Sequence, residues 1–343
     1  MKRVAHIDAR KSDHIKINLE QDVRSGLTSG LEHYHFVHEA LPELDLEAID
    51  TSLILFGKIL NAPILISSMT GGTEQAEEIN QHLAEAAHVC NVAMGVGSQR
   101  AALQDPKQIP TYAITRKVAP DILLFANLGA VQLNYGYGID ECRRAVDMIQ
   151  ADALFLHLNP LQEAVQAEGD TNFANLAIKI ESICRKLEVP VIVKEVGWGI
   201  SMRTAKILAS CGVAAIDVAG AGGTSWSQVE MHRAPDEFSR QLAAAFVGWG
   251  IPTVDSIFNI KEAAPEMTIF ASGGIKDGID VVKCIALGAT LGGMAGQLLN
   301  AAAISSNKAV EMIKITKKQI QLTMFAAGVG SLKGLESVEL LKH

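Results

Sequence analysis

The hydrophobic positions of this chain fall into short continuous runs, and each run is followed by a longer segment with helical periodicity. From about residue 60 onward the runs are Pro63–Ser68, Ala93–Val96, Ile122–Asn127, Ala153–His157, Val191–Glu195, Ala214–Val218, Thr268–Ser272 and Thr290–Met294. Continuous apolar runs, rather than strict alternation, are typical of parallel strands that are covered on both faces. The segments between them, such as Thr73–Val89, Asn172–Leu187 and Ile279–Leu287, are long enough to form crossover helices.

Eight strand–helix units of this kind predict an α/β fold, specifically a (β/α)8 TIM barrel. The alternative is a doubly wound sheet. That fold would need a G-x-G-x-x-G phosphate-binding motif after its first strand, and neither this motif nor G-x-x-x-x-G-K-[ST] occurs in the sequence. The pattern therefore favours the barrel.

The remaining segments predict three parts of the chain: an N-terminal extension (1–60), the barrel (61–330) and a C-terminal tail (331–343). Within the extension, Ser52–Phe56 alternates and is followed by Gly57, Ile59 and Leu60, which predicts a hairpin that plugs the N-terminal face of the barrel. The long connection Gly220–Ile251 is an insertion between units six and seven, and we expect it to shape the substrate site.

Composition and charge narrow the class of protein. With 48% hydrophobic and 20% charged residues, the chain is too hydrophobic to be disordered. Its net charge of −8 and its lack of a basic block argue against a nucleic-acid partner. No run of about 18 apolar residues predicts a membrane span. The five cysteines are scattered, without a C-x-x-C pair, and the charged N-terminus has no signal-peptide core, so we expect a soluble cytoplasmic protein.

Polar and glycine residues follow nearly every apolar run, always at the end where a barrel carries its catalytic groups. They predict one site at this rim, formed by the segments Ser67–Thr73, Gly97–Arg100, Asn127–Gly129, His157–Glu163, Lys194–Gly197, Gly220–Trp226, Ser272–Gly278 and Ala295–Gly296. The glycines after the last two strands favour a phosphate held by backbone N–H groups at helix N-termini. Tight turns are the alternative explanation for these glycines.

Single residues at this rim allow more than one interpretation. Lys194 ends a buried run, so it is a Schiff-base lysine, a fixed cation against an electron-rich cofactor, or half of an ion pair with Glu195 or another barrel carboxylate. His157 is either catalytic or a hydrogen-bonded strand-end histidine. Glu163, with water and phosphate oxygens, suits Mg²⁺. Arg10 lies in a basic N-terminal patch that is either mobile or a ligand for a diphosphate.

A set of motifs gives these residues a common meaning. The sequence contains the following motifs in this order: RKSDHI, SSMTGG, GVGSQR, HLNPLQE, EGD, KEVGWGIS, AGAGGTSW followed by Glu230 and Arg233, SGGIKDG and AGQLL. From about residue 8 to residue 330 the chain closely resembles the type 2 isopentenyl-diphosphate Δ-isomerase family. Small departures are Asp13, Ala167 and Lys276, where that family often has other residues.

The resemblance implies an isomerase that interconverts isopentenyl diphosphate and dimethylallyl diphosphate in isoprenoid biosynthesis. It implies FMN and Mg²⁺ as cofactors, NADPH as the reductant of the flavin, and a homo-oligomer, either a tetramer or an octamer. The implied catalytic residues are Gln162, His157 and Lys194. The implied substrate-binding residues are Arg10, Lys11, Ser98, Gln99, Arg100 and Gln162. The implied FMN-binding residues are Ser68, Met69, Thr70, Ser98, Asn127, Lys194, Thr224, Gly274, Ile275, Lys276, Ala295 and Gly296, and the implied metal ligand is Glu163.

Two other functions fit the same barrel. An FMN-dependent hydroxy-acid oxidase would need a histidine base near the end of strand six or seven, with an arginine close by, but no histidine follows that strand before His232. A flavin-binding protein without catalytic activity is the other alternative. The presence of both Gln162 and Glu163 favours an enzyme.

Overall fold

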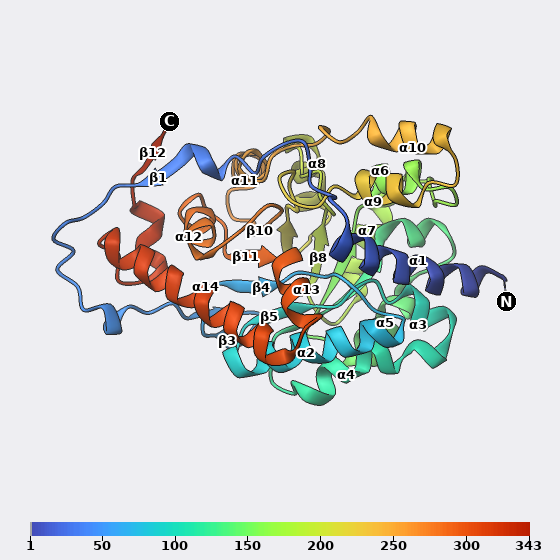
Figure 1. Cartoon of the computed structure of the whole chain (residues 1–343), viewed down its shortest axis with the longest axis horizontal. Coiled ribbons are helices and arrows are strands. Elements are labelled where there is room, and N and C mark those ends of the chain that lie inside the picture. The colour runs from blue at the N-terminus through green and yellow to red at the C-terminus, as the bar shows by residue number, and fades with distance from the viewer. Residues whose placement is uncertain (1) are drawn as a thin grey trace.

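A parallel barrel forms the centre of the molecule. The computed structural model describes residues 2–343, and for residues 2–9 it describes the backbone alone. Eight parallel strands close in the spatial order β10-β11-β4-β5-β6-β7-β8-β9 (Figure 1). They are β4 (Ile64–Ile66), β5 (Ala93–Gly95), β6 (Leu124–Gly129), β7 (Ala153–His157), β8 (Val191–Lys194), β9 (Ala215–Asp217), β10 (Thr268–Ser272) and β11 (Leu291–Met294). Each strand overlaps one predicted run, so the predicted TIM barrel is confirmed.

Helices surround the strands (Figure 1). Those of the barrel units are α2 (Glu74–Cys90), α3 (Arg100–Gln104), α4 (Pro110–Val118), α5 (Ile139–Ile149), α6 (Pro160–Val165), α7 (Leu176–Lys186), α8 (Met202–Ser210), α11 (Thr253–Ala263), α12 (Gly278–Ala286), α13 (Gly296–Ala302) and α14 (Ser306–Ala326). Short 3-10 helices are η1 (Leu31–His33), η2 (Leu46–Ala48), η3 (Pro106–Gln108), η4 (Ala130–Asn134) and η5 (Leu332–Ser337). The three predicted crossover helices correspond to α2, α7 and α12.

The start of α2 shows how the sequence sets a helix boundary. Thr73 has an extended backbone, and its hydroxyl accepts a hydrogen bond from the N–H of Ala76 at 3.1 Å. We expect Thr73→Ala to lower the free energy of unfolding by about 1 kcal/mol, because one N–H of the first turn loses its acceptor. Urea denaturation measures this loss. Gln75→Ala, an exposed change in the same turn, is the control, and an equal loss in both variants would contradict the assignment of the cap.

Aromatic and aliphatic side chains fill the interior of the barrel. Phe125 contacts Phe155 edge-on at a centroid distance of 5.1 Å and stacks on Phe270 at 6.0 Å. Side chains alternate along a strand, so the next residues on the same face lie two positions further towards the carboxyl end. Beyond the apolar layer of Leu65, Phe125, Phe155, Ile192, Ala215 and Phe270, these positions carry Ser67, Asn127, His157, Lys194, Asp217 and Ser272. A polar layer, defined by these six residues, therefore covers the core at the carboxyl ends of the strands.

The N-terminal extension contacts both ends of the barrel. Its hairpin of β2 (Leu53–Leu55) and β3 (Lys58–Leu60) closes the N-terminal end, where Leu55 and Leu60 join the interior core. A helix that the sequence analysis did not predict, α1 (Lys2–Glu20), contacts α3, α13 and α9 (Trp226–Arg233). Figure 1 shows α1, α6, α9 and α10 (Glu237–Ala244) gathered at one side of the barrel. Helices α9 and α10 belong to the predicted insertion between units six and seven.

The C-terminal segment returns to the N-terminal extension. Its strand β12 (Leu340–Lys342) pairs antiparallel with β1 (Tyr34–Phe36), and the ammonium of Lys342 lies 5.6 Å from the ring centroid of Tyr34. Within residues 2–343, no helix combines the length and the apolar composition needed to cross a membrane.

Candidate active site

His157 occupies the polar layer as a neutral imidazole. Its Nδ1 lies 2.8 Å from Oδ1 of Asn127, whose Nδ2 donates to the carbonyl of Val96 at 3.0 Å. Burial, with the nearby charge of Lys194, lowers the pKa of His157 to about 3. A neutral ring that bonds an amide oxygen through Nδ1 carries its proton there, which leaves Nε2 as a hydrogen-bond acceptor. His157 can therefore receive a hydrogen bond but is a poor proton donor at neutral pH.

Lys194 is a buried cation on the neighbouring strand. Its ammonium donates to the carbonyl of Glu195 at 2.6 Å and lies 3.8 Å from Oδ2 of Asp217. The carboxylate of Glu195 points elsewhere and accepts the backbone N–H groups of residues 196–198. Burial raises the pKa of Glu195 to about 7 despite these bonds. The sequence allowed Glu195 or another barrel carboxylate as the ion-pair partner of Lys194, and the structure shows that this partner is Asp217.

Glycines line the loops that follow β9 and β10. A Cβ on Gly223 would lie 2.7 Å from the backbone nitrogen of Gly274, which has a φ of +76°. The two loops thus pack backbone against backbone, as only glycine allows. Helix α13 begins nearby at Gly296, where an added Cβ would meet nothing within 4 Å, and its first N–H groups have no acceptor within the helix. This arrangement of Gly274, Ala295 and Gly296 fits a phosphate group.

The end of β4 carries a polar group that needs a ligand. Among the residues that the structure describes, Ser68 has a buried hydroxyl without a hydrogen-bond partner. A Cβ on Gly95 would lie 2.6 Å from this hydroxyl, and the carbonyl of Thr70 accepts the N–H of Gly97 at 3.0 Å. Met69 and Thr224 are partly exposed. A buried orphan hydroxyl, the cation of the polar layer and the glycine loops together fit a flavin mononucleotide.

Helix α6 presents a buried carboxylate. Oε2 of Glu163 accepts from the N–H of Asp170 at 2.7 Å and from Nε2 of Gln166 at 2.9 Å, and Oε1 accepts from Nδ2 of Asn159 at 2.9 Å. Burial raises the pKa of Glu163. Oδ1 of Asn159 is buried without a donor in the described chain. Two buried oxygen ligands side by side fit Mg²⁺, which takes one or two carboxylates and completes its shell with substrate oxygens and water.

No larger metal centre competes with this assignment. Residues 2–343, as far as the structure describes them, contain no group of three or more histidine, cysteine, aspartate or glutamate side chains arranged to hold a metal ion. A cation at Glu163 would therefore depend on oxygens supplied by its substrate.

Helix α1 brings two cations to the same opening. The ammonium of Lys11 donates to the carbonyl of Ser98 at 2.9 Å and also bonds the hydroxyl of Tyr112. Nη1 of Arg10 lies 3.4 Å from Oε1 of Gln166, the side chain that also bonds Glu163. The N-terminal patch thus lies beside the carboxylate of α6, although the two are about 150 residues apart in sequence.

A third cation reaches this place from α3. Nη1 of Arg100 pairs with Oδ2 of Asp170 at 2.7 Å, and its Nε is buried without a partner in the part of the chain that the structure describes. Arg10 and Arg100 therefore lie near Glu163, with Lys11 next to Arg10 on the same helix, and the charges of these residues suit a diphosphate.

Two candidates have groups that are engaged elsewhere. The side chain of Gln99 is fully buried, donates to the carbonyl of Ala145 at 2.8 Å and accepts the N–H of Asn127 at 2.9 Å. It therefore does not join the cation cluster. The N–H of Lys276 donates to Asp280 at 3.1 Å, so only the exposed ammonium of Lys276 is left for a ligand.

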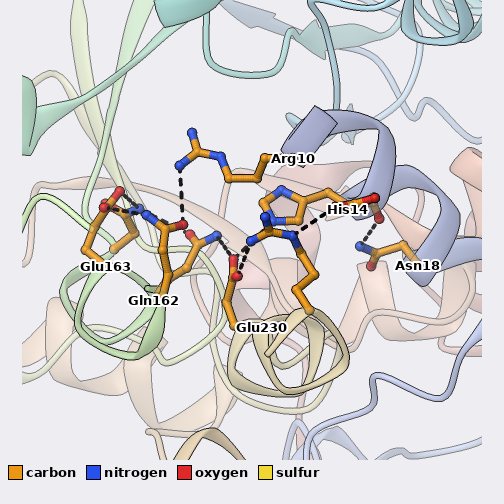
Figure 2. Close-up of polar contacts among 10 residues, drawn as sticks. Arg10, His14, Asn18, Gln162, Glu163 and Glu230 are labelled. Carbon is orange, nitrogen blue, oxygen red and sulfur yellow. Dashed lines mark hydrogen bonds and ion pairs between the residues drawn. The ribbon is translucent and has the colours of Figure 1, made fainter. Parts of the chain in front are cut away.

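Sequence reasoning gave no role to Glu230 and His14, whose side chains join α9 to α1. Oε1 of Glu230 lies 3.0 Å from Nε2 of His14 and accepts from Nε2 of Gln162 at 3.2 Å, and its Oε2 pairs with Arg233 at 2.6 Å. Figure 2 shows Glu230 between Gln162 and His14, with Arg10 and Glu163 nearby. Burial opposes ionisation of Glu230, but the bond from His14 and the charge of Arg233 outweigh it and lower its pKa to about 2. The spacing of Glu230 and Arg233 on one helix was the available signal.

The loop that supports Glu163 depends on a glycine. A Cβ on Gly169 would lie 1.8 Å from the carbonyl oxygen of Glu163. We expect Gly169→Ala to lower the free energy of unfolding by about 1–3 kcal/mol, because the loop must open and Glu163 loses the N–H of Asp170. Urea denaturation measures the loss. Gly248→Ala, where an added Cβ meets nothing within 4 Å, is the control and should stay within about 0.5 kcal/mol of the parent. A similarly small change in Gly169→Ala would contradict the tight contact.

Comparison with known folds supports the barrel alone. The chain aligns with a mandelate oxidase solved with (S)-2-phenylpropionate at a TM-score of 0.69 and 17% identity, covering 99% of this chain and 98% of that one. It aligns with a lactate oxidase of Pediococcus acidilactici at a TM-score of 0.68 and 16% identity, covering 99% and 94%. The histidine base that the oxidase alternative requires has no counterpart in the polar layer beyond the neutral His157, and His232 is exposed on α9.

Closer relatives identify the family. A family model described as FMN-dependent dehydrogenase matches residues 143–342. The chain is 51% identical over 332 residues to an isopentenyl-diphosphate delta-isomerase of Rickettsia akari, covering 97% of both chains. It is 53% identical over 332 residues to that of Synechocystis sp., covering 96% of this chain and 95% of the relative. The chain therefore belongs to the FMN-dependent, type 2 family of isopentenyl-diphosphate delta-isomerases.

Proposed function

We propose that this isomerase interconverts isopentenyl diphosphate and dimethylallyl diphosphate at the opening of its barrel, with reduced FMN and Mg²⁺ bound and NADPH as the reductant of the flavin. The observation that carries the proposal is the meeting of Arg10 and Arg100 with the buried carboxylate of Glu163, above a polar layer whose histidine is neutral. The near full-length identity to isopentenyl-diphosphate delta-isomerases supports it.

The reaction needs a proton donor and a proton acceptor close to an apolar carbon chain. An isolated alkene is a weak base, and its protonation develops positive charge at a tertiary carbon. His157 is neutral, Glu230 is ionised and paired, and the oxygens of Glu163 accept three hydrogen bonds. None of these three side chains is therefore a suitable donor of the proton that the alkene must receive. Reduced FMN, when bound, would supply the acid–base chemistry that the side chains do not.

The protein's own part is to bind and orient the substrate. Arg10, Lys11 and Arg100 would hold the diphosphate, helped by Ser98, and Glu163 would hold Mg²⁺. Gln162, whose amide is fixed by Glu230, would contact the substrate near its double bond. Gln99 would support this group indirectly, because its side chain bonds the carbonyl of Ala145 and the N–H of Asn127.

The cofactor contacts follow the rim of the barrel. Lys194 and Asn127 would face the flavin from the polar layer, and His157 would offer Nε2 as an acceptor. The ring would be lined by Ser68, Met69, Thr70, Ser98 and Thr224, and the phosphate would be held by Gly274, Ile275, Lys276, Ala295 and Gly296. The orphan hydroxyl of Ser68 and the glycine loops support this placement.

Assembly and location complete the proposal. Exposed apolar side chains in the insertion, among them Phe238 and Trp249, support a homo-oligomer, which we expect to be a tetramer or an octamer in the cytoplasm. Light scattering coupled to size exclusion would measure the mass of the assembly directly.

Product formation tests the function. Under anaerobic conditions, the protein with isopentenyl diphosphate, FMN, Mg²⁺ and NADPH should form dimethylallyl diphosphate, and omission of FMN should abolish this. Oxygen consumption with lactate or glycolate, without isomerisation, would instead support a hydroxy-acid oxidase. FMN binding without either reaction would support a flavin-binding protein.

A further inference from the structure

Asp217 is a buried carboxylate without an assigned role. It ends β9, is fully shielded from solvent, and lies in register with Lys194 on β8. Residues in register on neighbouring parallel strands point to the same face of the sheet. Asp217 and Lys194 therefore share the polar layer that covers the apolar core.

The contacts of Asp217 leave one oxygen for Lys194. Its Oδ1 accepts from the hydroxyl of Ser272 at 2.6 Å and from the N–H of Ala219 at 3.3 Å. Its Oδ2 has no hydrogen-bond partner among the described residues and lies 3.8 Å from the ammonium of Lys194. The serine and the backbone thus orient the carboxylate towards the lysine.

Other neighbours of Lys194 do not balance its charge. His157, in register on β7, is neutral, and the carboxylate of Glu195 is occupied by backbone N–H groups. Within the described chain, Asp217 is the carboxylate that the structure pairs with Lys194. A buried ammonium without a counter-ion is strongly disfavoured and tends to lose its proton.

We propose that Asp217 is a positioning residue that keeps Lys194 charged and fixed next to the flavin in both oxidation states of the flavin. The inference rests on the proposed function, because it requires FMN to lie against Lys194. Reduction adds negative charge to the flavin. A charged Lys194 favours this reduced form, and Asp217 keeps the ammonium protonated and oriented because it supplies the buried counter-ion.

The midpoint potential of bound FMN tests this role without an activity assay. Each variant would be purified with FMN and titrated with dithionite against a reference dye. We expect Asp217→Asn to shift the equilibrium between oxidised and reduced flavin at least tenfold towards the oxidised form, a fall of about 30 mV for a two-electron couple, because Lys194 without its counter-ion tends to lose its proton. In a Lys194→Met background the same substitution should change nothing, because Asp217 then lacks its cation and burial favours its protonated form.

The outcomes separate this inference from the proposed function. A wild-type protein that does not bind FMN overturns the proposed function itself. A wild-type protein that binds FMN, with an unchanged potential in Asp217→Asn or an equal shift in the Lys194→Met background, overturns the role of Asp217 alone. If Asp217→Asn does not fold, Ser272→Ala, which removes the hydroxyl bonded to Oδ1, should give a smaller shift of the same sign, and no shift overturns the proposal.

Discussion

Glu163→Gln is expected to lower kcat/KM for isomerisation about a thousandfold while FMN binding stays at the wild-type level. The two carboxylate oxygens of Glu163 accept three hydrogen bonds, and an amide would turn one N–H towards these donors. The variant would also lose the charge that holds Mg²⁺ against the diphosphate. Steady-state rates at increasing Mg²⁺ concentration, with FMN binding followed by fluorescence, measure both effects.

Glu168→Gln is the matched control for this prediction. Glu168 lies in the loop that follows α6 and carries the same charge, but it is exposed. The control should retain wild-type rates and the same dependence on Mg²⁺. Wild-type activity in Glu163→Gln at every Mg²⁺ concentration would refute the assignment of Glu163 as the metal ligand.

Glu230→Gln is expected to lower kcat about a hundredfold, with little effect on FMN binding. Glu230 joins three groups from separate elements: His14 of α1, Gln162 of α6 and Arg233 of its own helix. A neutral amide loses the charge partner of Arg233, and it cannot accept from all three groups at once. Gln162 would then lose its fixed orientation towards the substrate. Rapid-quench measurement of a single turnover separates this effect from substrate binding.

The control for Glu230 lies in the neighbouring helix. Glu237→Gln removes an exposed carboxylate that pairs with Arg240, also three residues away, and it should leave kcat unchanged. If Glu230→Gln left kcat as unchanged as Glu237→Gln, the hydrogen bonds that join His14 of α1 and Gln162 to Glu230 would have no part in catalysis.

The barrel could be predicted because its signal is local. Each buried strand must be apolar over its whole length, and the residues that follow it must be polar or glycine to form the rim. The same signal predicts that Lys194, Glu163 and the glycine loops lie at one end of the barrel. The register of the strands then decided between Glu195, the neighbour in sequence, and Asp217 as the partner of Lys194.

The features that the sequence did not predict depend on contacts between segments that are distant along the chain. Helix α1 is polar along most of its length, so its sequence gives only a weak helical pattern of apolar residues. Its residue Ile15 is buried by packing against the rest of the chain. Because α1 was not predicted, the contact between His14 and Glu230 could not be predicted either. Gln99 stands at a strand end like its neighbours, but its side chain is directed to Ala145 of α5, which sequence position alone does not show.

The central claim is that the barrel opening holds a reduced flavin, which would supply the acid–base chemistry of the reaction. It is tested most directly by reconstituting the protein with 5-deaza-FMN, in which carbon replaces the nitrogen N5, and by measuring dimethylallyl diphosphate formed per bound flavin. We predict normal binding of the analogue and a rate at least about a hundredfold below that with FMN. Full turnover with bound 5-deaza-FMN would contradict the claim.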